Sequence, residues 1–379
     1  NDLSIEALWR DKAFDAKVSV ASRLAGTAKA NVRTQLIANG WGVKDTANAA
    51  LSGVLQLQLD DLSRLGPWVS PTLQLGGRLQ ADLTLGGTHS QPKPTGLISA
   101  SGLRARHKYG DFDIGGGELT ARLDDSGVDI ERLYLHGVGD ASQGGYASAS
   151  GRLNWAASSP TINSTEAQGK LKLKLVGFQA ASKADRRISI SGDMVSQWRD
   201  QRLSVGGDLR IDKADIMLGK FGAPSLGDDV VVLGNTEPAP PRALPLELDI
   251  DLSLGDAFKV AGFGLTTGLR GKLHISGSDA YNQPILNGEV NTVDARYKAY
   301  GQDLLVKRVR LLFSGRPDAP QLGILAVRAL TEPQVGLQVQ GPLSAPKVEL
   351  YANVSMPDSE KLSWPLLGHP HPPRRSQAG

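Results

Sequence analysis

Alternation of apolar and polar residues with a period of two runs through most of this chain and constrains its fold more than any other feature. Between Leu246 and Leu254, leucine or isoleucine occupies every second position, and Glu, Asp or Ser occupies the positions between them. The pattern recurs from Leu73 to Leu85 and from Leu171 to Leu175, where lysines intervene. Because successive side chains of a strand point to opposite faces, each segment predicts a β-strand with one apolar and one solvated face.

A glycine followed two residues later by leucine accompanies many of these segments. We interpret it as a signature that opens strands, at Gly53, Gly77, Gly117, Gly151, Gly169, Gly207 and Gly271. The irregular gaps argue against a solenoid of fixed repeat length. They favour a meander of antiparallel strands joined by turns such as Asp124 to Gly127. Gly77 lies within the run from Leu73 to Leu85 and predicts a bend there.

Helix signals are few, so we expect an all-β chain with few short helices. The best candidates are Asp60 to Trp68, ended by Gly66 and Pro67, and Met356 to Trp364. Four prolines between Gly234 and Pro245 predict an excursion across the sheet surface, because proline cannot donate a ladder hydrogen bond. The residues after Gly368 have the composition of a disordered tail.

Composition excludes several classes of function. The 42 basic and 39 acidic side chains are spread along the strands and form no aromatic-flanked basic patch, which argues against nucleic-acid binding. The chain has no cysteine, which excludes a disulfide framework and suits an oxidising compartment such as the periplasm. It shows neither a signal peptide nor an apolar run of about 18 residues, so we expect a soluble protein or a piece of a longer one.

Motifs for catalysis, metals or cofactors are missing, and we predict no enzyme, no metal and no cofactor. The six histidines show no helical pair of zinc-site spacing. The segment Gly262 to Gly268 has the glycines of a phosphate loop, but no helix pattern follows, and we interpret it as a strand with a turn. Asp249 and Asp251 alternate with leucine and isoleucine, which explains them as a solvated face.

The residues alone leave two other folds open. Leucine alternation is most often that of a sheet packed on a second sheet, which would make the chain a structural or adhesive β-sandwich with a closed core. A transmembrane barrel would need aromatic girdles at two depths. The seven tyrosines, six tryptophans and seven phenylalanines are scattered and form no such girdles.

Five segments of the C-terminal part resemble the TamB family, the translocation and assembly module subunits related to AsmA-like and bridge-like lipid-transfer proteins. These segments are Asp228 to Gly234, Leu254 to Leu273, Ala295 to Gly315, Val335 to Ala352 and Ser355 to Gly368. The residues before 221 share with this family only the general style of their strands. The chain departs from the family where Pro365 interrupts a usually apolar helix and where a Pro- and Arg-rich tail replaces the usual final segment.

The resemblance implies a long antiparallel sheet curled into a U-shaped trough (a β-taco), apolar inside and polar outside. It implies a periplasmic bridge between inner and outer membranes that conducts phospholipids and supports envelope and outer-membrane protein assembly, with an outer-membrane β-barrel as partner and an inner-membrane anchor outside this chain. We divide the chain into a repetitive trough region at 1–221, a TamB-like C-terminal domain at 222–368 with its proline-rich excursion at 234–245, and a tail at 369–379.

The candidate groove-lining residues are those that alternation places on the apolar face. They are Leu73, Leu75, Leu79, Leu83, Leu85, Leu171, Leu173, Leu175, Leu246, Leu248, Ile250, Leu252, Leu254, Leu269, Leu273, Ile275, Val335, Leu337 and Val339. A charge in the middle of this face, as in Ile250→Arg, is expected to block lipid passage and leave the fold intact. Further candidates for contact with anionic headgroups are the cations Lys307, Arg308 and Arg310. A short element that faces a membrane or a partner is expected at Trp364, Leu366 and Leu367.

Overall fold

The computed structural model describes fifteen stretches of the chain, and nearly all of them are strand. The described residues are 2–10, 13–22, 26–35, 38–39, 42–43, 47–64, 72–107, 113–138, 144–155, 167–183, 185–218, 245–277, 284–299, 302–328 and 333–357. The chain divides into two compact units. Unit 1 comprises Asn1–Lys183, Ile188–Leu209 and Arg242–Glu247, and unit 2 comprises Ala184–Arg187, Arg210–Pro241 and Leu248–Gly379. The domain boundary that we expect near residue 221 lies outside the described residues.

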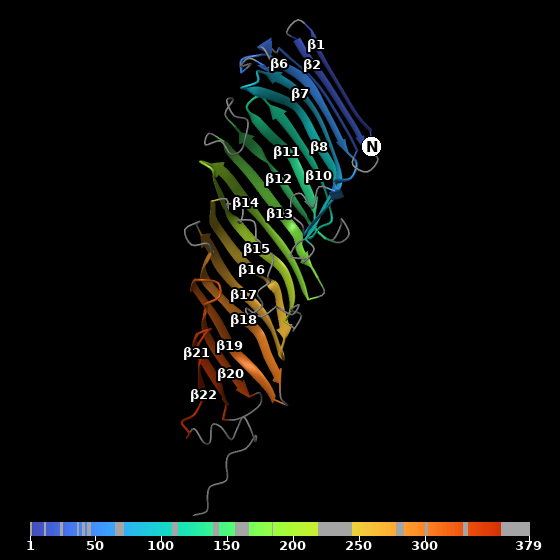
Figure 1. The fold of residues 1–379 in the computed structure, drawn as a ribbon. Coiled ribbons are helices and arrows are strands. Elements are labelled where there is room, and N and C mark those ends of the chain that lie inside the picture. Colours follow the sequence, from blue (N-terminus) through green and yellow to red (C-terminus); the bar gives the residue numbers. More distant parts are fainter. Residues whose placement is uncertain are drawn as a thin grey trace, which may run out of the picture. The chain divides into compact units, whose positions relative to one another are not determined.

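Unit 1 is an antiparallel meander in which each long strand pairs with the next long strand along the chain (Figure 1). Its order is β1 (Asp2–Arg10), β2 (Ala13–Ser22), β3 (Gly26–Gln35), β6 (Leu51–Leu59), β7 (Leu73–Gly87), β8 (Pro92–His107), β10 (Gly116–Asp124), β11 (Gly127–His136), β12 (Tyr146–Asn154) and β13 (Gln168–Ser182). Short β9 (Asp113–Ile114) pairs with β8, whereas β4 (Ala38–Asn39) and β5 (Gly42–Val43) pair with each other.

Three strands contain the divisions between the two units. They are β14 (Arg186–Arg199), β15 (Arg202–Leu218) and β16 (Leu246–Gly262). Unit 2 continues the antiparallel pattern from β16 through β17 (Leu265–Gly277), β18 (Ile285–Ala299), β19 (Gln302–Gly315), β20 (Gln321–Arg328), β21 (Val335–Pro342) and β22 (Lys347–Ala352).

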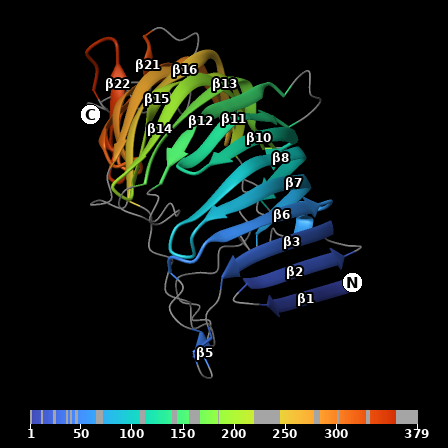
Figure 2. The same ribbon diagram turned by 90° about the horizontal axis from the view of Figure 1, so that it is seen from above.

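The all-β prediction is confirmed, and the sheet of each unit is antiparallel and open. No pairing among the described residues joins the first strand of either meander to its last. Figure 2 shows that long strands such as β8, β13 and β16 bend along their length, so the sheets are curled and not flat. The predicted turn from Asp124 to Gly127 connects β10 to β11.

The predicted bend at Gly77 is confirmed, whereas the prediction that these glycines open strands is wrong at several positions. Gly77 has a φ of 113°, and the register between β7 and β8 shifts between Gly76 and Arg78, so the predicted bend exists as a bulge. Gly151, Gly207 and Gly271, like Gly77, lie inside strands and do not open them. A Cβ on any of these four would lie less than 3 Å from the neighbouring strand, so close backbone approach explains the glycine.

In the described part of the helix expected from Asp60 to Trp68, residues 60–64 contain one 3₁₀ turn. This turn, η1, spans Leu62–Arg64. Asp61 caps it by accepting hydrogen bonds from Ser63 N at 2.9 Å and Ser63 Oγ at 2.7 Å, and these bonds lower the pKa of Asp61. Residues 65–71 lie outside the described part. So do residues 234–244 of the proline-rich excursion and residues 358–379, which include most of the second expected helix and the tail.

No second layer covers the strands in the part of the chain that the structure describes. The substantial contacts between described elements run between strands that neighbour each other in the meander, apart from η1 against β7 and β9 against β13. A β-sandwich would instead show two sheets packed about 10 Å apart. The closed sandwich therefore finds no support in these residues.

The two units bury different residues. In unit 1 the buried apolar side chains among the described residues are alanines and Leu62; in unit 2 they include Ile250, Phe258, Val290, Val327 and Val335. The apolar face of unit 1 therefore keeps its large side chains partly in contact with solvent, whereas unit 2 also buries several larger apolar side chains.

Candidate functional site

The strand register of unit 1 aligns the apolar positions into rows that cross the whole meander. Residues paired directly across antiparallel strands point to the same face. One row consists of Leu3, Val20, Ala28, Leu57, Ala81, Ile98, Ala121, Ile130, Gly151 and Leu171. The next row consists of Ile5, Val18, Ala30, Leu55, Leu83, Gly96, Leu123, Val128, Leu153 and Gly169. Ten strands at about 4.8 Å make each row roughly 45 Å long.

Small side chains lie between large ones at several places along the rows. Ala81 lies between Leu57 and Ile98 and is buried, and Ala149 lies between Leu133 and Leu173 and is also buried. The large neighbours cover the alanines, while their own outer surfaces stay accessible because no further layer of described residues packs on them. This arrangement gives unit 1 a continuous apolar surface without polar interruptions along the rows.

The sequence-predicted residues of unit 1 lie on this surface. Leu79, Leu83, Leu85, Leu171, Leu173 and Leu175 occupy its rows, and all six are half-buried. Leu73 and Leu75 lie beyond the Gly77 bulge, are also half-buried and alternate with exposed Gln74. Leu246, at the start of β16, is exposed and belongs to unit 1.

Unit 2 repeats the arrangement with its own register. Leu252 pairs with Leu273, and Ile250 pairs with Ile275, which in turn pairs with Leu286. A further row comprises Val309, Ile324, Val339 and Val348. The predicted residues Leu248, Leu254, Leu269 and Leu337 are half-buried. Ile250 and Val335 are buried and contribute to the core of unit 2, so Ile250→Arg tests stability as much as lipid passage.

Bulges interrupt the alternation of unit 2 in a way that sequence analysis missed. The pairing of β16 with β17 shifts between Leu254 and Lys259, and the pairing of β19 with β20 shifts between Val306 and Arg308. Between β17 and β18 the shift lies between Thr266 and Gly268. Bulges increase the local twist and bend of a strand, so neighbouring bulges curl the sheet.

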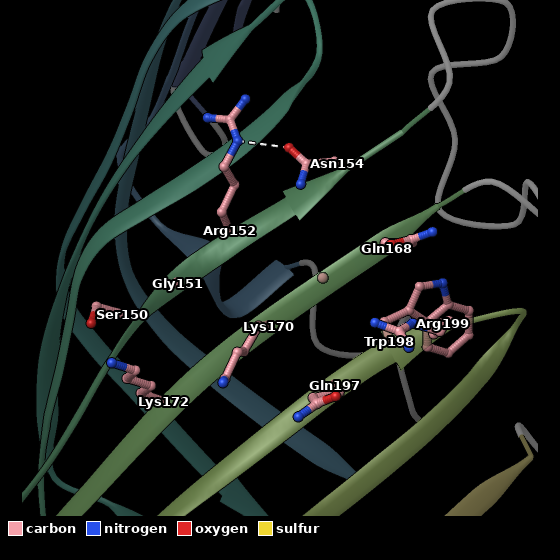
Figure 3. Close-up of a pocket in the computed structure, with 11 residues that line it drawn as sticks. Ser150, Gly151, Arg152, Asn154, Gln168, Lys170, Lys172, Gln197, Trp198 and Arg199 are labelled. Carbon is pink, nitrogen blue, oxygen red and sulfur yellow. Dashed lines mark hydrogen bonds between the residues drawn. The ribbon is translucent and has the colours of Figure 1, made fainter.

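The opposite face of unit 1 is polar and carries both cations and acids. Figure 3 shows a hollow on this face, of about 570 Å³, with Arg152 on β12, Lys170 and Lys172 on β13, and Arg199 on β14. Arg152 Nε donates a hydrogen bond of 2.7 Å to Asn154 Oδ1. A cationic hollow of this kind suits water or anions and does not suit acyl chains, so the two faces are chemically distinct.

Ion pairs anchor the turns on the polar face. Arg152 Nη2 lies 2.7 Å from Asp124 Oδ2, and Ser126 donates from both its backbone N and its Oγ to the same carboxylate. The Arg152 side chain and then Ser126 lower the pKa of Asp124 to about 2, so this carboxylate is ionised at neutral pH. Because both partners are partly exposed, the pair contributes little to stability and mainly fixes the turn.

The other candidate residues lie apart from the apolar rows. Asp249 and Asp251 are exposed on the polar face beside His274, whose Nδ1 lies 3.0 Å from Asp251 Oδ1. No cluster of three or more metal-ligating side chains occurs among the described residues. There, too, no helix is long and apolar enough to cross a lipid bilayer.

The three predicted headgroup cations have different surroundings. Arg310 pairs with Glu289 and lowers the pKa of that carboxyl, with Asn291 as a second donor. Lys307 donates to Gln334 Oε1. Arg308 is exposed and stays a candidate for headgroup contact. Trp364, Leu366 and Leu367 lie outside the described residues.

Comparison with known proteins matches residues 136–378 to the model of the TamB C-terminal domain, which is more than half of the chain. The chain belongs to the TamB family. A curated relative, the translocation and assembly module subunit TamB of Haemophilus influenzae, is 23% identical over 346 residues. That match covers 85% of this chain and 25% of the relative, so the chain spans about a quarter of the relative's length. The TamB match begins at His136, the last residue of β11, well before the segments that carry the resemblance in the sequence.

Proposed function

We propose that this chain conducts phospholipids along its apolar face, as part of a periplasmic bridge between the inner and outer membranes of a Gram-negative envelope. The observation that carries the proposal is the set of apolar rows crossing ten strands of unit 1 with no described element packed against them. A large apolar surface left open on a soluble domain is unusual and marks a binding site. The sheet of unit 1 is curled (Figure 2), and we infer that the apolar face lines its concave side as a trough.

The chemistry of an acyl chain fits this surface. Moving one phospholipid into water exposes roughly thirty methylene groups at about 0.8 kcal/mol each, which amounts to tens of kcal/mol. A continuous apolar face removes most of that cost. Because hydrophobic contact has no preferred direction, a lipid can slide from row to row without breaking specific bonds. The headgroup stays in water along the open side, and no catalytic residue takes part.

The family supports the biological setting. The relative in Haemophilus influenzae is named a subunit of a translocation and assembly module. We infer that this chain likewise serves envelope biogenesis and outer-membrane protein assembly, with an outer-membrane β-barrel as its assembly partner. Lipid supply to the outer membrane and protein assembly there are compatible, since a barrel inserts into the bilayer that the lipids build.

Native mass spectrometry on the chain purified without detergent tests the proposal. We expect several phospholipids to remain bound to each chain, because the rows extend roughly 45 Å across unit 1 and one acyl chain covers only part of that length. Lipid extraction from the same sample identifies their headgroups. A lipid-free monomer with unchanged circular dichroism would contradict the proposal, because it would show that the apolar face is stable without acyl chains.

A further inference from the structure

The turn between β16 and β17 presents a phenylalanine in a backbone conformation that phenylalanine disfavours. Gly262 pairs with Leu265, which leaves Phe263 and Gly264 as a two-residue turn. Their φ angles are 50° and 85°. Two positive φ angles define a turn in which Asn-Gly is the preferred sequence, because asparagine tolerates the left-handed region better than residues with bulky side chains.

No packing contact among the described residues of unit 2 explains the choice of residue. Phe263 is 67% exposed, so its ring gains little from packing within the chain. The other non-glycine residues with positive φ in the described part are Asp200, Gln201 and Asp294, all of them polar. A strained position that holds an exposed aromatic ring therefore points to a contact outside the chain.

Further apolar side chains lie beside this turn. Leu218, the last residue of β15, adjoins Gly262 so closely that an added Cβ on that glycine would lie 2.5 Å from Leu218 Cβ. Leu218 and its neighbour Met217 are both exposed. On the other side of the turn, the backbone N of Lys298 donates to Gly264 O at 2.8 Å. The turn is therefore held firmly while its apolar side chains face outward.

Exposed cations lie close to the turn. Arg296 pairs in register with Thr266, three residues after Phe263, and is exposed, as is Lys259. Of the nearby acids, Asp256 is in an ion pair with Arg270 and Asp215 with Lys213. Asp294 is exposed as well. Apolar side chains flanked by cations suit an anionic bilayer, where the ring enters the interface and the cations meet phosphates.

We propose that the Phe263 turn docks unit 2 on an anionic lipid bilayer. Phe263, Leu218 and Met217 enter the interfacial region, and Arg296 with Lys259 contacts headgroup phosphates. The docking does not depend on lipid conduction along the apolar face. A protein pocket for Phe263 is the competing interpretation, and it predicts no binding to protein-free vesicles.

Vesicle flotation of the full chain tests the docking. With vesicles of phosphatidylethanolamine and phosphatidylglycerol, Phe263→Asn is expected to weaken partitioning at least about tenfold, whereas Phe263→Leu stays within about threefold. Asparagine relieves the backbone strain, so the urea midpoint of Phe263→Asn should equal or exceed that of the unaltered chain. Arg296→Glu should weaken partitioning several-fold and remove part of its salt dependence.

A matched control uses Leu343, which is 51% exposed between β21 and β22. Leu343→Asn makes a similar apolar-to-polar change in another turn of unit 2 and should leave partitioning unchanged. The proposal is overturned if the unaltered chain fails to float, if it floats equally with phosphatidylcholine alone, or if Phe263→Asn floats as well as the unaltered chain. Leu55→Arg, on the apolar face of unit 1, should lose lipid transfer and keep docking, which separates the two proposals.

Discussion

Leu55→Arg is expected to lower the rate of phospholipid transfer between donor and acceptor vesicles by at least about tenfold. Leu55 lies in a row between Ala30 and Leu83 and is 38% exposed, so its side chain borders the path of an acyl chain. An acyl chain that passes the guanidinium must displace water from its charge, and this desolvation costs several kcal/mol. The long arginine side chain can bend away and so lower that cost. A barrier increase of about 1.4 kcal/mol already gives the tenfold effect.

The control for this variant is the adjacent position on the same strand. Gln56 points to the polar face and is exposed, so Gln56→Arg adds the same charge without touching the path. Both variants should keep the free energy of unfolding within about 1 kcal/mol of the unaltered chain, since neither site is buried. Transfer by Leu55→Arg at the unaltered rate would show that lipid does not pass along this row.

Gly96→Ala is expected to lower the free energy of unfolding by more than about 3 kcal/mol. Gly96 lies on β8 with a φ of 146°, and a Cβ there would lie 2.1 Å from Asp82 O on β7. The methyl group would push the two strands apart and break ladder hydrogen bonds in the row that contains Leu83. Backbone strain accounts for about 1–2 kcal/mol, and the lost ladder accounts for the rest. Urea unfolding followed by circular dichroism measures the change.

Gly102 provides the comparison because it also has a positive φ but has open space where a Cβ would lie. It lies on the same strand with a φ of 61°, but a Cβ there would meet nothing within 4 Å. Gly102→Ala should therefore cost only the backbone strain, about 1 kcal/mol. Equal destabilisation by the two variants would show that close strand approach at Gly96 does not contribute to the stability of unit 1.

The strands were predictable from sequence because their signal is local. Alternation identified the apolar positions of Leu79 to Leu85 and of Leu171 to Leu175, and the strand register places these residues on one face. Two aspartates and a glycine likewise identified the turn between β10 and β11. Each of these features depends on a few consecutive residues, which the chain itself displays.

Features that depend on neighbouring strands were not predictable in the same way. The buried alanines Ala81, Ala121 and Ala149 are part of the apolar face, yet their covering partners lie on other strands, so only the register shows the placement of small side chains between large ones. In the sequence, their occurrence at every second position of a strand indicated that they lie on the apolar face. The bulge between Leu254 and Lys259 also depends on β17, and alternation on β16 alone does not indicate it.

The described part of the helix expected from Asp60 to Trp68 contains a 3₁₀ turn and no α-helical turn. Asp60 to Trp68 has a capping aspartate and a leucine at the expected spacing, but isolated helices of this length are marginal in water. Within the described residues 60–64, the turn at Leu62–Arg64 forms, where Leu62 is buried and packs near β7. Burial of Leu62 helps to hold this turn in place.

Photo-crosslinking from the two faces of β6 tests most directly whether the apolar face holds acyl chains. A photoreactive residue at Leu57, in the first apolar row, should yield adducts with the mass of phospholipid when the chain is irradiated in a Gram-negative envelope and analysed by mass spectrometry. The same residue at Gln58, exposed on the polar face, should yield few or none. Equal labelling from both positions, or none from Leu57, would contradict lipid conduction along the rows.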